Sequence, residues 1–210
     1  MTSCSFVKKV LIFVSILGAS YEASAQRFSR GGGSSPGPSI GAMVLFGQGK
    51  MGNETDVLKR SMIHTPVAVF AGFNIRKFRL GLNYEYNLVG QSDDPANYSN
   101  QNIGGKSNAP GIRLDYWNGT TAVGMVYRMN EKFTLDKPTI NGLVSEYESK
   151  NGFSFQYYRQ IRKRIGIVLD YSMGELKSSA GNSDDLKWDR AGIGIVFSNF
   201  AGGSSSGRRR

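Results

Sequence analysis

Beyond residue 25 the chain contains no cysteine and only one histidine, His64. The lack of cysteine excludes disulfides, thiolate catalysis and cysteine metal sites from that part of the chain. No stretch there approaches 18 consecutive apolar residues, which excludes a transmembrane helix. Helical periodicity of 3.6 residues is also lacking, so we expect an all-β structure.

Residues 1–25 have the composition of a signal peptide. Lys8 and Lys9 precede a short apolar run, Val10–Ala19, and the sequence Ala-Ser-Ala at residues 23–25 provides a cleavage site before Gln26. Cys4 lies upstream of the apolar run and is therefore not the acylated cysteine of a lipoprotein. We predict a cleaved signal peptide, after which about 185 residues remain, enough for one domain.

Flexible segments are expected on both sides of that domain. Residues 26–38 are rich in Gly, Ser and Pro and predict a tether, and residues 201–210 form a similar tail that ends in three arginines. The tail is interpreted as a basic periplasmic end. The domain itself is predicted over residues 39–200.

Within the domain, short segments of period-2 alternation are joined alternately by tight turns and by long polar loops. The tight turns are expected at Arg76-Lys77, Asn118-Gly119 and Ile161–Arg164, and the loops around Gly52–Thr65, Gln91–Ala109, Asp136–Asn151 and Lys177–Lys187. Eight strands result: Ser39–Met51, Pro66–Arg76, Phe78–Gly90, Pro110–Trp117, Thr120–Asp136, Gly152–Gln160, Ile165–Leu176 and Trp188–Phe200. Several approach the ~9–11 residues that cross a bilayer at a tilt. Unequal ends of this kind are typical of a transmembrane β-barrel.

The third segment shows most clearly which face meets which environment. Phe78, Leu80 and Leu82 begin an apolar face, whereas Arg79 and Glu85 lie on the opposite, polar face. The polar faces of the strands also carry many glycines, which weaken an exposed strand but leave room for long side chains inside a narrow barrel. We therefore predict an eight-stranded antiparallel up-and-down transmembrane β-barrel with its apolar face toward lipid. The first strand is apolar on both faces and is not oriented by its sequence.

Seven charged residues on the polar faces are predicted to form a network inside the barrel. Because a buried charge needs a partner, the four arginines are expected to pair with the three acids and plug the interior. The members are Arg79, Glu85, Arg113, Asp115, Arg128, Asp170 and Arg190. The alternative is an ion pathway through a small, low-conductance pore. Aromatics near strand ends, Trp117, Phe133 and Trp188 among them, are expected in the headgroup girdles.

The formal net charge of +10 raises the question of nucleic acid. The basic residues are scattered over turns, loops and strands, and no recognition motif is present, so no nucleic-acid partner is expected. Basic loops that face anionic lipid or lipopolysaccharide phosphate explain the charge better.

Strand number, the turn and loop asymmetry and the polar interior resemble those of the small eight-stranded bacterial outer-membrane barrels, such as the transmembrane domain of outer membrane protein A. The last strand is also similar to the signal read by the barrel-assembly machinery, with Arg190, Gly192, Ile195 and Phe197 at the matching positions. The resemblance implies the outer membrane of a Gram-negative cell envelope, with outer-membrane lipid and lipopolysaccharide and the assembly machinery as partners. An extracellular partner would bind through the long loops.

No residue set predicts catalysis. Some barrels of this size are enzymes, the lipid A palmitoyltransferases and deacylases, and a resemblance to them implies a histidine that works with serine and an acid. In this sequence Ser61 and Asp56 lie near His64. No spacing pairs them, so His64 is interpreted as a surface loop residue. Asp93-Asp94 and Asp184-Asp185 lack the spacing of a calcium loop. We predict a non-enzymatic barrel without cofactor or metal, with a structural or surface-interaction role. A lipid A-modifying enzyme remains the alternative.

Overall fold

The computed structural model describes residues 37–52, 60–92, 104–118, 120–136, 146–162, 164–178 and 185–198. The predicted signal peptide, most of the predicted tether and the predicted C-terminal tail lie outside these residues. Within them, no helix is long and apolar enough to cross a membrane.

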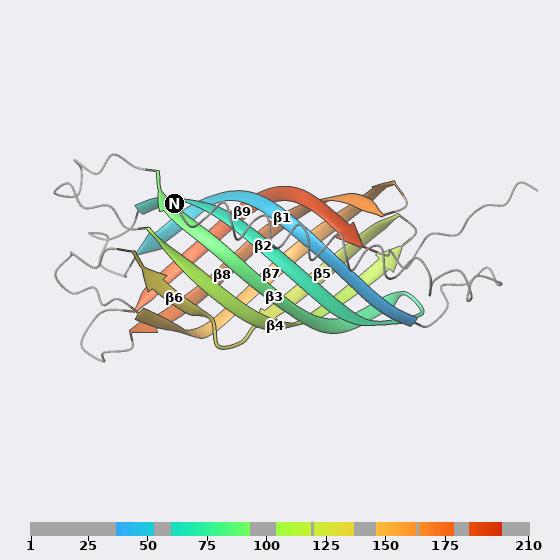
Figure 1. Ribbon diagram of the computed structural model, residues 1–210, viewed down its shortest axis with the longest axis horizontal. Helices are drawn as coiled ribbons and strands as arrows, with labels where there is room; N and C mark the ends of the chain where they lie inside the picture. Colours follow the sequence, from blue (N-terminus) through green and yellow to red (C-terminus); the bar gives the residue numbers. More distant parts are fainter. Residues whose placement is uncertain are drawn as a thin grey trace, which may run out of the picture.

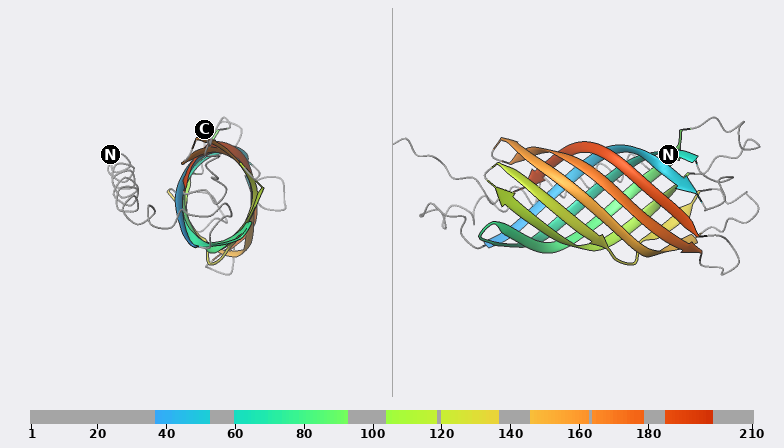
Figure 2. Two further views of the ribbon diagram at one scale, coloured as in Figure 1. Left: turned by 90° about the vertical axis from the view of Figure 1, so that its right-hand side faces the viewer. Right: turned by 180° about the vertical axis from the view of Figure 1, so that it is seen from behind.

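Antiparallel strands form one sheet that closes on itself (Figures 1 and 2). Each strand pairs with its neighbours in sequence, and the first pairs with the last, β1 with β9. The strands β5 and β6 follow each other along one stave of the barrel, since both pair with β4 on one side and β7 on the other. The predicted eight-stranded up-and-down transmembrane barrel is therefore confirmed. The strands are β1 (Gly37–Gly52), β2 (Arg60–Ile75), β3 (Phe78–Gln91), β4 (Gly105–Asn118), β5 (Thr121–Arg128), β6 (Lys132–Leu135), β7 (Glu146–Arg162), β8 (Ile165–Ser178) and β9 (Leu186–Ser198).

The two ends of the barrel differ as the sequence predicted. The turns β2–β3, β4–β5 and β7–β8 lie at one end, on the right of Figure 1, together with the start of β1 and the end of β9. We call this the turn end, and the opposite end the loop end. Arg76 makes the tight β2–β3 turn at a positive φ of 54°.

Three strands extend several residues further toward the loop end than predicted: β2, β4 and β7, the last of which begins at Glu146 and not at Gly152. In β2 and β4 the reason is that proline interrupts the hydrogen bonding to one neighbouring strand without ending its own strand. Pro66 and Pro110 were taken as strand starts, yet β2 begins at Arg60 and β4 at Gly105. The β1–β2 pairing stops at Val44–Val67 and resumes at Gly47–His64, whereas Pro66 stays paired with Asn87 of β3. Proline lacks one N–H and therefore removes one ladder hydrogen bond on one side only.

A bulge separates β5 from β6 and reverses the alternation of faces. Between the pairs Gly111–Arg128 and Asn108–Lys132, three residues of one strand oppose two of β4. Asn130 adopts a positive φ of 51°, which asparagine tolerates better than most residues. As a result, odd-numbered residues face lipid before the bulge and face the interior after it. A second register shift in β7, between Ser149 and Asn151, lies at a similar level.

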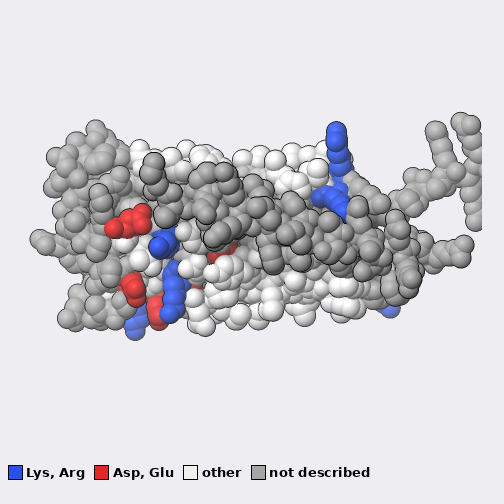
Figure 3. All heavy atoms as spheres, viewed as in Figure 1, with Lys and Arg blue, Asp and Glu red and all other residues white. Residues whose placement is uncertain are grey.

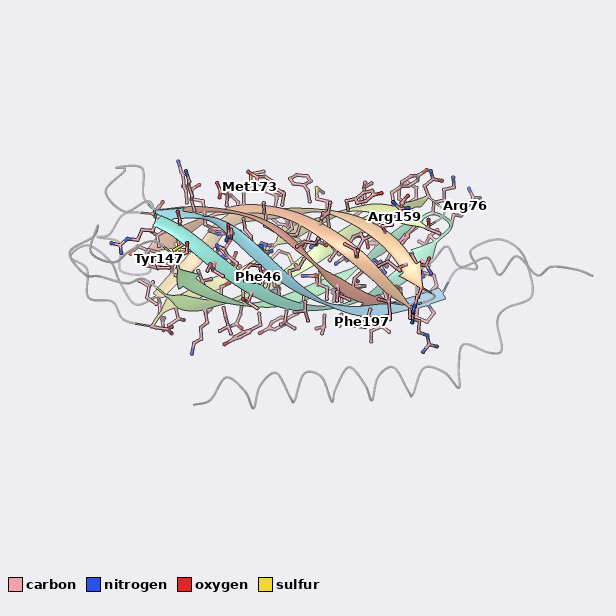
Figure 4. All side chains as sticks on the ribbon, turned by 90° about the horizontal axis from the view of Figure 1, so that it is seen from above. Phe46, Arg76, Tyr147, Arg159, Met173 and Phe197 are labelled. Atoms are coloured by element: carbon pink, nitrogen blue, oxygen red, sulfur yellow. The ribbon has the colours of Figure 1, made fainter. Side chains whose placement is uncertain are left out.

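The outer surface of the barrel is apolar between its ends. Large side chains such as Leu82, which is 66% exposed, and Phe46 point away from the interior, as do the labelled Met173 and Phe197 in Figure 4. On β3 this surface runs from Phe78 to Leu88, or about 33 Å of strand at roughly 3.3 Å per residue. A tilt of about 40° reduces the height to about 25 Å, the band expected of an outer-membrane barrel.

Three aromatics expected in the headgroup girdles lie inside instead. Trp117, Phe133 and Trp188 are buried. The bulge turns Phe133 inward, and both tryptophans occupy the inward phase of their strands. Phe78 and Tyr116 do face outward at the turn end, with ring centroids 5.2 Å apart.

Candidate functional site: the charged interior of the barrel

The charged residues predicted for the interior are all buried, and each lies within ion-pair distance of another. They form two clusters, one nearer the turn end and one in the middle of the barrel. The alternation of β3, β4, β5, β8 and β9 explains this placement, since every member lies on the inward phase of its strand.

In the first cluster Asp115 holds two arginines. Its Oδ2 accepts from Nε of Arg79 at 2.6 Å and from Nε of Arg113 at 2.8 Å. Arg79 also donates through Nη1 to the hydroxyl oxygens of Ser39 and Ser198, both at 3.1 Å. These two serines belong to the first and last strands, so Arg79 links four staves across the barrel interior.

Aromatic rings cover the faces of the same guanidinium groups. Arg113 lies 4.2 Å from the ring centroid of Phe70 and 5.1 Å from that of Tyr158. Arg79 lies 4.7 Å from Phe70 and 5.4 Å from Trp117. Planar guanidinium groups stack on rings in this way while their edges keep donating hydrogen bonds. The stacking explains how Phe70 packs directly against two buried charges.

The second cluster is built around Glu85. Its Oε1 accepts from Nη2 of Arg128 at 2.7 Å and from Nη1 of Arg190 at 2.9 Å. Arg190 also donates to Oδ2 of Asp170, through Nη2 at 2.9 Å and Nε at 3.1 Å. Hydroxyl groups complete the cluster, because Arg128 donates to Ser154 and Arg190 to Ser172.

Gln156 connects the two clusters. Its Nε2 donates to Oδ1 of Asp170 at 2.9 Å, and its Oε1 accepts from Arg113 at 3.0 Å and from the hydroxyl of Tyr158. An unbroken chain of hydrogen bonds therefore runs from the turn end to the middle of the barrel. Buried charges that are all paired in this way rigidify a core rather than offer a free reactive group.

Glycine makes room for these long side chains at particular points. A Cβ on Gly124 would meet Oδ1 of Asp115 and, at 3.2 Å, the ring of Tyr158. A Cβ on Gly47 would lie 2.9 Å from the side chain of Arg190. Gly124 thus has the packing role that the sequence suggested, whereas a Cβ on Gly72, Gly81, Gly192 or Gly194 would meet the backbone of a neighbouring strand.

Apolar side chains fill the interior on both sides of the charged middle. Toward the loop end one cluster includes the inward-turned Phe133 together with Tyr147. Toward the turn end a second cluster surrounds the Arg79 and Arg113 side chains. The loop-end cluster consists of Met51, Met62, Val89, Phe133, Leu135, Tyr147, Leu176, Leu186 and Trp188. The turn-end cluster consists of Met43, Leu45, Ala68, Phe70, Trp117, Ala122, Tyr158, Val168 and Val196.

His64 does not lie in a surface loop, and that prediction was wrong. Because β2 runs back to Arg60, His64 falls inside the strand and is 1% exposed. Its Nδ1 lies 3.1 Å from Nδ2 of Asn87, and its ring is 6.3 Å from that of Trp188. Ser61 occupies the outward phase of the same strand, so the two side chains lie on opposite faces. Asp56 lies outside the described residues.

Sequence reasoning missed two further buried charges. Glu131 lies 3.5 Å from Nη1 of Arg128, and only the bulge turns it inward. Arg60 donates to Oε1 of Gln91 at 2.9 Å, on a stretch of β2 that was taken for a loop. The combination Asn130-Glu131 after a regular alternation was the one available signal for the bulge.

The residues of the predicted assembly signal alternate along β9. Arg190 and Gly192 take the inward phase, whereas Ile195 and Phe197 face outward. Among the described residues, no group of three or more His, Cys, Asp or Glu side chains could hold a metal ion. Asp93, Asp94 and Asp184 lie outside those residues.

A closed eight-stranded barrel with an apolar outer band and a charged interior is the fold of the small outer-membrane barrels. Solved structures of that class are similar to this chain. Neisserial surface protein A matches with a TM-score of 0.50 and 12% identity, over 78% of this chain and 98% of that one. Ail, the attachment invasion locus protein of Yersinia pestis, matches with a TM-score of 0.50 and 12% identity, over 77% and 98%. No family model and no curated protein matches the sequence.

Proposed function

We propose that this protein is a non-enzymatic, non-conducting barrel of the bacterial outer membrane, with a structural role or a role in surface interaction. The start of β1 and the end of β9 lie at the turn end. That end faces the periplasm in this proposal, and the four longer connections face outward. The interior then stabilises the barrel, and the loop end is the part available to partners outside the cell.

The observation that carries the proposal is the way the interior is filled. Charged side chains in the middle are satisfied by one another, and apolar clusters lie toward both ends. An ion crossing this interior would have to displace Arg190 from two carboxylates or pass between packed rings. Eight strands leave an interior that side chains just fill, which agrees with a plug rather than a channel.

The placement of His64 argues against the enzyme alternative. A catalytic histidine needs a nucleophile or an acid at hydrogen-bond distance and access for substrate. His64 is buried beside Asn87 and Trp188, and Ser61 points to the other side of the sheet. Neither condition is met by the described residues.

Single-channel recording in planar bilayers tests the proposal. We expect the folded protein to show no steady conductance over a range of voltages, because paired charges and packed apolar side chains fill the described interior. The variant Trp188→Ala removes one large side chain from the apolar cluster near the loop end. Its conductance shows how much current leaks when this packing is loosened. Steady single-channel steps in the unaltered protein would replace the plug with a pore.

Lipid analysis tests the enzyme alternative separately. Cells that produce the protein and cells that produce His64→Ala are expected to contain the same lipid A species. A difference between them, at equal amounts of folded protein in the outer membrane fraction, would reinstate an enzymatic role.

A further inference from the structure

Among the described residues, the exposed charges at the turn end of the barrel are all positive. At the turn end, Arg76, Lys77, Arg159, Arg162 and Arg164 are all exposed, and no exposed acid lies there among the described residues. Lys163 and the sequence segments that lead into β1 (residues 26–36) and out of β9 (residues 199–210) add six more cations and again no acid. By sequence, five described cations at this end are accompanied by six more in the β7–β8 turn and the two flanking segments.

The loop end has the opposite balance. Outside the buried interior, its strand ends and connecting segments contain eight lysines and eleven acids by sequence. Three of the described lysines there stand beside acids of the neighbouring strand: Lys132 is 3.5 Å from Glu148, and Lys187 and Lys50 are in register with Glu175 and Asp189. The expectation that basic loops explain the charge of this chain is therefore wrong.

The cations of the turn end lie directly at the edge of the apolar band. Lys77 Nζ lies 6.0 Å from the ring centroid of Tyr116, which faces lipid. Arg159 follows the lipid-facing Tyr157 on the outward phase of β7, and Figure 4 shows it on the outside of the barrel. In Figure 3 the charges at this end are blue, and the described surface next to them is mostly white. Long basic side chains in this position extend to the depth of lipid headgroups.

We propose that the ring of cations at the turn end binds the phosphodiester headgroups of anionic phospholipids in the adjoining leaflet. Within this ring, the proposal concerns Lys77, Arg159 and Arg162 first. Guanidinium groups offer paired donors that match phosphate oxygens. Among the described residues, no exposed carboxylate at this end competes with phosphate for Lys77, Arg159 or Arg162. A basic surface at headgroup depth attracts anionic lipid additively, charge by charge.

This inference refines the membrane placement in the proposed function by naming the lipid class and the end that binds it. It does not depend on which way the barrel is inserted, because both leaflets of a reconstituted vesicle carry the same lipids. A failed lipid preference therefore leaves the non-conducting barrel intact, and a conducting barrel leaves the lipid preference intact.

Spin-labelled lipids measure the preference in vesicles that contain the full folded chain. The readout is the association of spin-labelled phosphatidylglycerol with the protein relative to that of spin-labelled phosphatidylcholine. We expect a ratio well above one that falls with added salt. The triple variant Lys77→Gln/Arg159→Gln/Arg162→Gln is expected to lose most of this lipid preference. Each cation removed should lower the association ratio by a factor on the order of five, before the effect of salt screening.

The matched control removes three lysines from the loop end, Lys50→Gln/Lys132→Gln/Lys187→Gln. It changes net charge by the same amount and should keep the ratio of the unaltered protein, because those lysines face acids. A ratio near one in the unaltered protein, or equal losses in both triple variants, overturns the proposal. So does an unchanged lipid ratio in the turn-end variant together with loss of binding to isolated peptidoglycan, which would make the cell wall the partner.

Discussion

Arg190 of β9 forms a bidentate ion pair with Glu85 of β3 across the barrel, donating from Nη1 to Oε1 at 2.9 Å and from Nη2 to Oε2 at 3.3 Å. The two residues are 105 positions apart, and their strands are not neighbours in the sheet. The same guanidinium holds Asp170 of β8. One side chain therefore ties together three strands through the middle of the molecule.

Removal of that side chain should be strongly destabilising. Arg190→Leu leaves Asp170 without an arginine among its described partners and Glu85 with Arg128 alone. We expect a loss of about 3–5 kcal/mol in the free energy of unfolding, as for other broken buried ion pairs. Urea titration in lipid vesicles, followed by tryptophan fluorescence, measures it. Lys187→Leu, on the outside of the same strand, should change the value by less than about 0.5 kcal/mol.

Arg113→Leu should cost less than Arg190→Leu, although sequence reasoning alone predicts the same 3–5 kcal/mol for it. Asp115 keeps Arg79 at 2.6 Å when Arg113 is removed, so its charge is not stranded. The same titration ranks the two variants. An unchanged unfolding midpoint in both would show that the network contributes nothing to stability.

Gly124 leaves room for the carboxylate of Asp115. Gly124→Ala places a methyl group against Asp115 and Tyr158 and is expected to cost about 1–3 kcal/mol. Gly90→Ala is the control, because nothing lies within 4 Å of a Cβ at that exposed glycine. Equal unfolding free energies for the two variants would contradict the packing described here.

The positive φ of Asn130 in the bulge can be tested by substitution. Asn130→Gly should leave stability within about 0.5 kcal/mol, whereas Asn130→Val should cost about 1–2 kcal/mol, since a β-branched residue resists positive φ. Thermal unfolding in detergent compares the two. A Val variant as stable as the Gly variant would mean that residue 130 does not adopt the left-handed conformation.

Both tryptophans of the chain, Trp117 and Trp188, lie inside the barrel. Lipids brominated on their acyl chains should therefore quench the native fluorescence weakly. A variant with Leu82→Trp as its sole tryptophan, in a Trp117→Phe/Trp188→Phe background, should be quenched strongly. Similar quenching of the two proteins would put the native tryptophans at the lipid surface, where the sequence first suggested them.

The strand count, the direction of each face and the unequal ends follow from period-2 patterning, because a regular strand fixes the side of every residue once one is known. The rest depends on events that interrupt this rule. Pro66 interrupts the pairing of β2 with β1 but does not end the strand. Because the sequence analysis placed the start of the strand at Pro66, it did not predict that His64 is buried. The bulge at residues 129–131 reverses the phase, which hid Glu131 and Phe133. Partners within the network depend on three-dimensional reach, so Gln156, which connects its halves, carried no signal.

The central claim is that the apolar face meets lipid, and cysteine chemistry tests it directly, since residues 26–210 contain no cysteine of their own. Single variants Leu82→Cys and Lys106→Cys, both on the outside of the barrel, are treated with a hydrophilic maleimide after folding into vesicles. We predict rapid labelling of Lys106→Cys near the loop end and almost none of Leu82→Cys until the vesicles are dissolved and the protein is unfolded. Equal labelling rates of the two folded variants would mean that Leu82 faces water and would contradict the account.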